Sequence, residues 1–281
     1  MGTQAKIVGS VAALASAAAA SGPALAGDPP LKSTLIPPPP AVPTWQGFYV
    51  GGSLGASWLS SVSDDSGAQP LNYGRAVGLD FAQYTETGGS RAMTSGLGWL
   101  GALQAGYNFQ NRNFVYGVEG DFAWLGSTKT SLNGQHVLNY TFNYFPVGTF
   151  SANSNAPTTR SSQVNELALL RGRFGVDFGG TLPYLTAGLA LGNVKNSYSI
   201  EYFGNGYAAS NSSWVPGVVL GGGLEHQLNE HWSLRGEILW VGFKDQTLNH
   251  ISGLNGSSGY AATVRFSNDL MLGQIGVNYK F

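Results

Sequence analysis

The feature that most constrains this chain is a two-residue alternation of apolar with small or polar side chains. In FYVGGSLGASW (48–58), aromatic and aliphatic residues occupy one face of an extended chain, and Tyr, Gly and Ser occupy the other. The same pattern recurs in segments that begin at Leu97, Phe114, Ala168, Leu182, Trp214, Trp232 and Asp269. No run after Trp45 approaches the roughly 18 apolar residues of a membrane-spanning helix. The pattern therefore predicts eight β-strands.

The connections between these segments alternate in length. QNRN, GGT and NEH are tight, whereas the other connections are many times longer. Short periplasmic turns that alternate with long external loops are typical of a transmembrane barrel. The predicted fold is all-β: an eight-stranded antiparallel up-and-down transmembrane β-barrel.

Aromatic residues near both ends of the predicted strands support the membrane interpretation. Amphipathic rings collect at the two membrane–water interfaces, and here Val, Leu, Ala and Gly lie between them. A soluble lipocalin-like barrel would instead direct its apolar face inward and its charges outward. The predicted girdle consists of Phe48, Trp58, Trp99, Trp124, Trp214, Trp232 and Trp240, with Phe109, Phe114, Phe178 and Phe266 as further members.

The N-terminal region predicts export. A single Lys6 precedes an Ala-rich apolar run that ends at Ala24-Leu25-Ala26, which fits the cleavage rule of a signal peptide at 1–26. A membrane anchor is the alternative, but the run is too short to span a bilayer. Eight of the 13 prolines occur at or before Pro43. Residues 27–44 therefore predict an extended periplasmic segment or, as the alternative, a recognition motif, and 45–281 the barrel domain.

Composition excludes several kinds of function. The 14 Lys and Arg are scattered, which argues against nucleic acid, and the absence of Cys excludes disulfides and thiolate metal sites. His136, His226, His231 and His250 lack the spacing of a zinc site. His250 with Asp245 is the one pair that resembles part of a hydrolase site, and common loop serines add little to it. The sequence predicts no enzyme and no cofactor.

Charged residues are predicted to point into the barrel, on the face opposite the aromatics. An eight-stranded barrel has an interior just wide enough to be filled by side chains, and buried charges need partners. Ring order predicts that Glu119, Asp121 and Glu237 reach Arg171 and Arg173. The inward charges are Glu119, Asp121, Arg171, Arg173, Asp177, Glu225, Arg235 and Glu237, and the inward glycines that leave them room include Gly51, Gly55, Gly175 and Gly221. This favours a salt-bridged lumen, with a gated polar pathway for small solutes as the alternative.

Two expectations concern the external side. Glu166 falls on the lipid face but precedes its strand, so it is expected above the membrane. The segment Leu138–Phe145 alternates strongly and is expected to extend the barrel as a hairpin. Its aromatic residues Tyr140, Phe142 and Tyr144 either stabilise that hairpin or bind haem or a host surface.

Several segments resemble the small outer-membrane barrels of Gram-negative bacteria, in particular the alphaproteobacterial outer-membrane immunogenic or porin-family proteins. The matching segments are WQGFYVGGSLGASW, LRGRFGVDF with LPYLTAGLALG, GGGLEHQLNEHWSLRGEILWVGF and the terminal GVNYKF. The resemblance implies an outer-membrane location and a last strand recognised by the assembly machinery through Ile275, Val277, Tyr279 and Phe281. Because the sequence ends at Phe281, the peptidoglycan-binding domain of larger outer-membrane proteins is expected to be absent. A monomer in the lipid bilayer with a structural or surface-interaction role is expected. The alternatives are a narrow porin or a haem or host-matrix binder.

Overall fold

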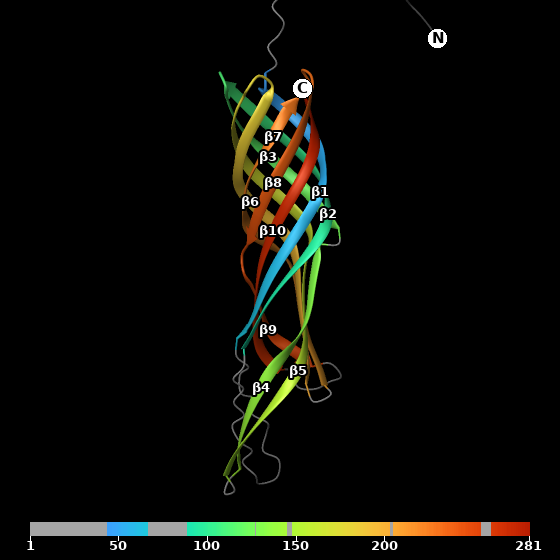
Figure 1. Cartoon of the computed structure of the whole chain (residues 1–281), viewed down its shortest axis with the longest axis vertical. Helices are drawn as coiled ribbons and strands as arrows, with labels where there is room; N and C mark the ends of the chain where they lie inside the picture. Colours follow the sequence, from blue (N-terminus) through green and yellow to red (C-terminus); the bar gives the residue numbers. More distant parts are fainter. Residues whose placement is uncertain (1–43, 67–88, 127, 145–147, 203–204, 254–259) are drawn as a thin grey trace, which may run out of the picture. The chain divides into compact units, whose positions relative to one another are not determined.

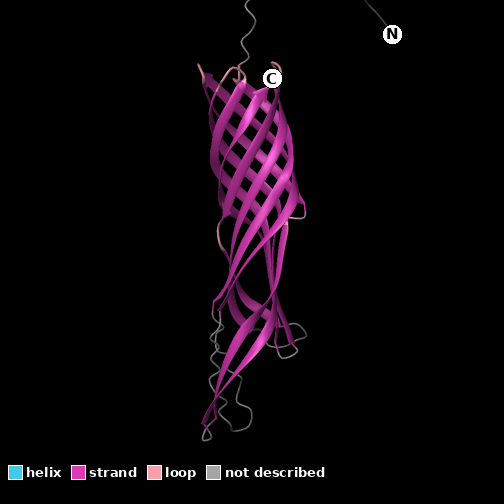
Figure 2. Ribbon diagram, in the orientation of Figure 1, coloured by secondary structure: helices cyan, strands magenta, loops and turns pink. Residues whose placement is uncertain are grey.

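The structure is a computed structural model that describes residues 44–66, 89–126, 128–144, 148–202, 205–253 and 260–281. These residues are almost entirely β-strand (Figures 1 and 2). Within them, no helix is long and apolar enough to cross a membrane. The strands are β1 (Gly47–Ser66), β2 (Gly89–Asn111), β3 (Phe114–Gly126), β4 (Lys129–Tyr144), β5 (Gly148–Val176), β6 (Thr181–Tyr202), β7 (Asn205–Gln227), β8 (Trp232–Phe243), β9 (Gln246–Gly253) and β10 (Tyr260–Lys280).

Eight of these strands form a closed antiparallel sheet. Their order is β1-β2-β3-β5-β6-β7-β8-β10, and β10 pairs back onto β1 from Tyr49↔Lys280 to Asp65↔Val264. Closure leaves no free strand edge in the wall, so every wall strand has hydrogen-bonding partners on both sides. The predicted eight-stranded up-and-down barrel is confirmed.

Strands β4 and β9 extend the sheet beyond the barrel wall. β4 pairs with β5 from Lys129↔Gln163 to Tyr144↔Gly148, which makes the expected hairpin. β9 pairs with β10 and, through Tyr207↔Gly253, with β7. Both added strands lie at the end of the barrel opposite the C-terminus (Figure 1). The wall strands are longer than predicted from the sequence. Their external ends carry polar residues on both faces, so no alternation marks them as strands.

The three tight connections predicted from the sequence, between β2 and β3, β5 and β6, and β7 and β8, lie at the end that carries the C-terminus (Figure 1). Between β2 and β3, Arg112 adopts a positive φ of 54°, and between β5 and β6 the turn uses Gly179 and Gly180, with φ of 69° and 92°. Asp177 was predicted to join the lumen charges, and this is wrong. It lies in the β5–β6 turn, where its Oδ1 accepts a hydrogen bond from Gly180 N at 2.9 Å.

Burial alternates along the strands as the pleat requires. In β8, Ser233, Arg235 and Glu237 are buried, whereas Trp232, Leu234 and Ile238 are exposed on the outer face. Phe266 was predicted to belong to the girdle, but it is 1% exposed and points into the lumen. It shares its face with Asn268 and Gln274, because even-numbered residues of β10 point inward.

Candidate functional site: the filled lumen

The lumen of the barrel contains a buried charged layer centred on Arg171. The Nε and one terminal nitrogen of Arg171 donate to the two oxygens of Asp121, each at 2.9 Å. Its other terminal nitrogen, Nη1, donates to Glu237 at 2.7 Å, and Nη2, which already donates to Asp121, also donates to Glu119. The Arg171 side chain is fully buried. All of its charge is therefore compensated inside the barrel, which is the condition for burying a guanidinium.

Arg235 and Arg173 extend this layer across the lumen. Arg235 donates to Glu119 at 2.7 Å and to Glu237 at 3.3 Å. Arg173 donates to Glu225 at 2.6 Å, and its guanidinium carbon lies 4.1 Å from the centre of the Tyr184 ring. The seven residues of this lumen charge network are Glu119, Asp121, Arg171, Arg173, Glu225, Arg235 and Glu237.

Neutral side chains complete the hydrogen bonding of the carboxylates. Tyr49 donates to Glu119 at 2.5 Å, and Asn278 donates to Glu225 at 2.7 Å. Gln274 donates to Glu237 at 2.7 Å. These donors matter because the network holds four carboxylates but only three guanidiniums, and hydrogen bonds from neutral groups also stabilise a buried anion.

Strand register accounts for the meeting of these side chains. Glu119 faces Arg171 directly across the β3–β5 pair, and Glu237 faces Gln274 across β8–β10. Glycine provides the room: a Cβ on Gly51 would lie 2.1 Å from Asn278 Oδ1 and 2.6 Å from Gln104 Nε2. Inward-facing glycines therefore lie at the same depth as long polar side chains, which fill the space that a glycine leaves free.

An apolar layer fills the lumen next to the charged layer, toward the external end. Its members are buried aliphatic and aromatic side chains from all eight wall strands: Leu59, Leu100, Ala102, Ala123, Leu125, Val164, Leu167, Leu169, Ala190, Val194, Val215, Val219, Leu239, Val241, Phe243, Leu270 and Leu272. This layer was not predicted from the sequence. The alternation that marks these strands assigns apolar residues outward, and the inward apolar residues begin only where apolar side chains occupy both faces.

A buried polar cluster lies beyond the apolar layer. Ser162 Oγ lies 2.5 Å from Asn196 Oδ1 and 2.7 Å from Asn268 Oδ1, and Asn196 Nδ2 donates to Gln246 at 2.6 Å. Arg160, which is 3% exposed, donates to Ser63 at 3.2 Å. Charged, apolar and polar layers therefore follow one another along the axis of the barrel.

The opposite mouth of the lumen is covered by Trp45, directly before β1. Trp45 is 3% exposed and packs with Val115, Leu182 and Tyr184. Its backbone nitrogen donates to Gln110 Oε1 at 2.7 Å. A cavity of about 20 Å³ beside it has room for a single water. The sequence predicts Trp45 only as the start of the barrel, because a single aromatic residue before a strand belongs to no alternation that would indicate the direction of its side chain.

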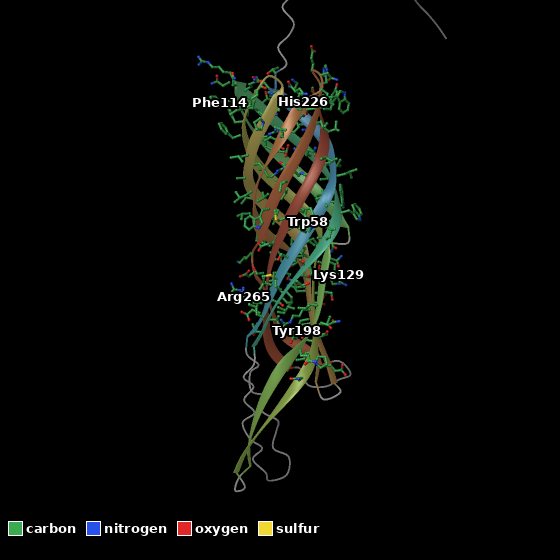
Figure 3. The ribbon with its side chains drawn as sticks, in the orientation of Figure 1. Trp58, Phe114, Lys129, Tyr198, His226 and Arg265 are labelled. Carbon is green, nitrogen blue, oxygen red and sulfur yellow. The ribbon has the colours of Figure 1, made fainter. Side chains whose placement is uncertain are left out.

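The seven residues predicted to form the aromatic girdle lie on the outer surface. Phe48, Trp58, Trp99, Trp124, Trp214, Trp232 and Trp240 are all exposed, with exposed fractions between 37% and 58%. Leu and Val side chains that are exposed to similar or greater extents lie between the two rows of rings. Figure 3 shows Trp58 and Phe114 toward different ends of the barrel.

The last strand ends among the aromatic residues of its own rim. Phe281 is 70% exposed, its ring centre lies 5.6 Å from that of Phe48, and its nitrogen donates to Phe48 O at 3.1 Å. Tyr279 lies between Trp232 and Phe281, with ring centres 5.0 and 5.1 Å away. Ile275 and Val277 are exposed on the same outward face.

The remaining sequence candidates are dispersed. Thr181 Oγ1 and His226 Nδ1 are 2.9 Å apart at one rim, and His231 stacks on Tyr279. Within the part of the chain that the structure describes, no cluster of three or more His, Cys, Asp or Glu could hold a metal ion. The side chains of His136, Tyr140, Phe142, Tyr144 and His250 lie outside the described set, although the backbone of Tyr140–Tyr144 pairs within β4.

Glu166 was expected to precede its strand, and this is wrong, because it lies within β5. It is half-buried in the same cross-strand row as Trp124, and its Oε2 accepts a hydrogen bond from Asn193 at 3.2 Å. The bulge between Val164 and Glu166 shifts the register there, which the sequence alone could not reveal.

Comparison with known proteins agrees with this architecture. The model of the outer membrane protein beta-barrel domain matches residues 10–281. The 31 kDa outer-membrane immunogenic protein of Brucella melitensis is 26% identical over 266 residues, which cover 92% of this chain and 93% of the relative. The 22 kDa outer membrane protein of Rhizobium leguminosarum is 28% identical over 84% of this chain and 79% of its own.

Solved structures similar to this chain include outer-membrane barrels. OprG from Pseudomonas aeruginosa matches with 14% identity and a TM-score of 0.42, over 84% of this chain and 96% of its own. The outer membrane protease OmpT from Escherichia coli matches with 12% identity and a TM-score of 0.41, over 84% and 97%. The family match and the named relatives assign the chain to the outer membrane of a Gram-negative bacterium. The chain belongs to the family of proteins with an outer membrane β-barrel domain.

Proposed function

We propose that this protein is a sealed, non-catalytic barrel that holds its external strands at the cell surface, with a structural or surface-interaction role. The observation that carries the proposal is the filled lumen. A solute would have to pass Trp45, the charged network and the apolar layer in turn. Each of these barriers consists of side chains that are almost fully buried.

Energetics support a plug over a gate. Opening the charged layer would separate Arg171 from three carboxylates at once, and each buried charge left without a partner costs several kcal/mol, about 3–5. The apolar layer adds a dry region next to it, which disfavours the passage of hydrated solutes. The narrow-porin alternative requires both layers to rearrange together.

Surface binding through the external strands is the second candidate function. Strands β4 and β5 continue as a long paired hairpin beyond the wall, which provides a platform that a purely structural barrel would not need. Haem or host matrix as the ligand remains a prediction. Replacing Tyr140, Phe142 and Tyr144 with Ser should abolish such binding while the folded barrel is retained.

Liposome swelling tests the sealed lumen. Vesicles that contain the refolded protein should swell in a pentose solution no faster than protein-free vesicles, whereas a general porin in the same lipid should accelerate swelling. Swelling at a rate that increases with the amount of this protein would favour the narrow-porin alternative and overturn the proposal.

A further inference from the structure

A row of polar side chains crosses three strands on the outer surface, just beyond the external girdle. Lys129 of β4 faces Gln163 of β5, and Gln163 faces Lys195 of β6 on its other side. Both lysines are exposed and Gln163 is half-buried. The two lysine Cα atoms are separated by two interstrand spacings, about 10 Å. Long side chains on one face at this separation can reach the same ligand.

The depth of this row relative to the membrane follows from the neighbouring register. Trp124, Glu166, Asn193 and Trp214 form a continuous cross-strand row in the external girdle. Lys195 lies two residues beyond Asn193, which is about 7 Å along the strand and about 5 Å along the membrane normal at a typical strand tilt. A headgroup layer is about 5–7 Å thick on each side of the hydrocarbon. The lysines therefore lie at headgroup depth, and Figure 3 shows Lys129 farther from the C-terminal end than Trp58.

In the strand register that the structure describes, no acidic residue lies directly across from either lysine: Lys129 faces Gln163, and Lys195 faces Gln163 and Ser212. Arg265 is ion-paired with Asp245, and Arg91 lies across from Asp64 in the β1–β2 pair. Among the described residues, neither Lys129 nor Lys195 forms an ion pair. Glu166, on the same face but one row nearer the membrane, accepts a hydrogen bond from Asn193 instead. The row leaves two cations available to a ligand.

We propose that Lys129 and Lys195 bind the phosphate monoester of a membrane lipid in the external leaflet. A lysine ammonium is a compact charge with three hydrogen-bond donors, which suits a phosphate oxygen in any orientation. Two lysines match the charge of about −1.5 to −2 that a phosphate monoester carries near neutral pH. The lipid is favoured over a soluble anion because Trp124 and Trp214 hold the row at headgroup depth. This inference requires the barrel but not a sealed lumen.

Native mass spectrometry of the refolded barrel with phosphatidic acid tests the site, with phosphatidylcholine as the lipid without a monoester. Lys129→Gln and Lys195→Gln should each weaken phosphatidic acid binding about fivefold, since a cation near an anionic lipid surface contributes that much. Arg91→Gln is the matched control, because it removes the same charge from an external position opposite Asp64. Its binding of phosphatidic acid should equal that of the wild type.

The competing outcomes are distinct. A folded membrane barrel resists SDS until it is boiled, so boiling shifts its mobility on an SDS gel. If the Lys129→Gln/Lys195→Gln double variant retains this heat shift and binds phosphatidic acid as the wild type does, the proposed site is overturned. Equal binding of phosphatidic acid and phosphatidylcholine to the wild type would do the same. Displacement of the lipid by millimolar inorganic phosphate would assign the site to soluble phosphate instead of lipid.

Discussion

Replacing Arg171 with Met should destabilise the barrel strongly, because three carboxylates would lose a shared partner. Arg171 is fully buried and contacts Asp121, Glu119 and Glu237. After the change, Arg235 still binds Glu119 and Glu237, but its nearest approach to Asp121 is 3.6 Å. The network would then hold four carboxylates and only two guanidiniums, instead of four carboxylates and three guanidiniums.

The expected loss in the free energy of unfolding is about 3–5 kcal/mol, the cost of a buried charge without its partner. With an m value of about 2 kcal/mol/M, the urea midpoint falls by roughly 2 M. Tryptophan fluorescence of the refolded protein in vesicles reports this midpoint. Arg265→Met is the matched control, since the Arg265 side chain is 64% exposed, and its ion pair contributes roughly 0–1 kcal/mol after solvent screening.

A double-mutant cycle separates charge pairing from packing. Asp121→Asn removes the surplus carboxylate, so it should cost less in the Arg171→Met background than in the wild type, with a coupling of at least about 1 kcal/mol. Additive losses, or a loss for Arg171→Met no larger than that for Arg265→Met, would refute the reasoning that the buried network holds the lumen together.

Three further predictions concern the rims. Trp45→Ala should lower the unfolding free energy by about 3–5 kcal/mol because it empties the packed mouth, whereas the lipid-facing Trp232→Ala should cost less; equal urea midpoints would contradict the plug. Deleting Phe281 should reduce the heat-shifted form in the outer membrane and leave protein open to periplasmic proteolysis, and normal surface levels would mean that this end carries no assembly signal. Arg265 donates hydrogen bonds to Asp245 and lowers the pKa of that external carboxyl, so any stabilisation from the pair is present at neutral pH and is lost as the pH falls through that pKa. The difference in urea midpoint between the wild type and Arg265→Met should accordingly vanish in acid, and a difference that persists there would exclude this cause.

The wall of the barrel was predictable from the sequence, because alternate residues of a membrane-barrel strand face the lipid and the lumen and differ in polarity. Phe48 to Trp58 shows this directly, since lipid requires apolar residues at one parity and the narrow lumen requires small or polar ones at the other. The same parity brought Arg171 and Glu119 to one face. Their pairing then followed from strand order, because adjacent strands put facing residues in contact.

Features without a two-residue period could not be predicted in this way. Leu59 and Leu167 lie inside the lumen where apolar residues occupy both faces, so no contrast marks their direction. Trp45 precedes the first strand, and its inward position depends on Val115 and Leu182 from distant strands. The bulge at Glu166 changes the register by an insertion that alternation alone cannot locate.

The single-channel conductance of the refolded wild-type protein in a planar bilayer tests the central claim of a sealed lumen most directly. The three successive layers behind Trp45 predict a baseline indistinguishable from that of the bare bilayer in molar salt, even at protein levels at which the heat-shifted barrel is abundant in the membrane. Reproducible ohmic steps from the wild type would contradict the account, because they require a continuous aqueous path through layers that we describe as filled.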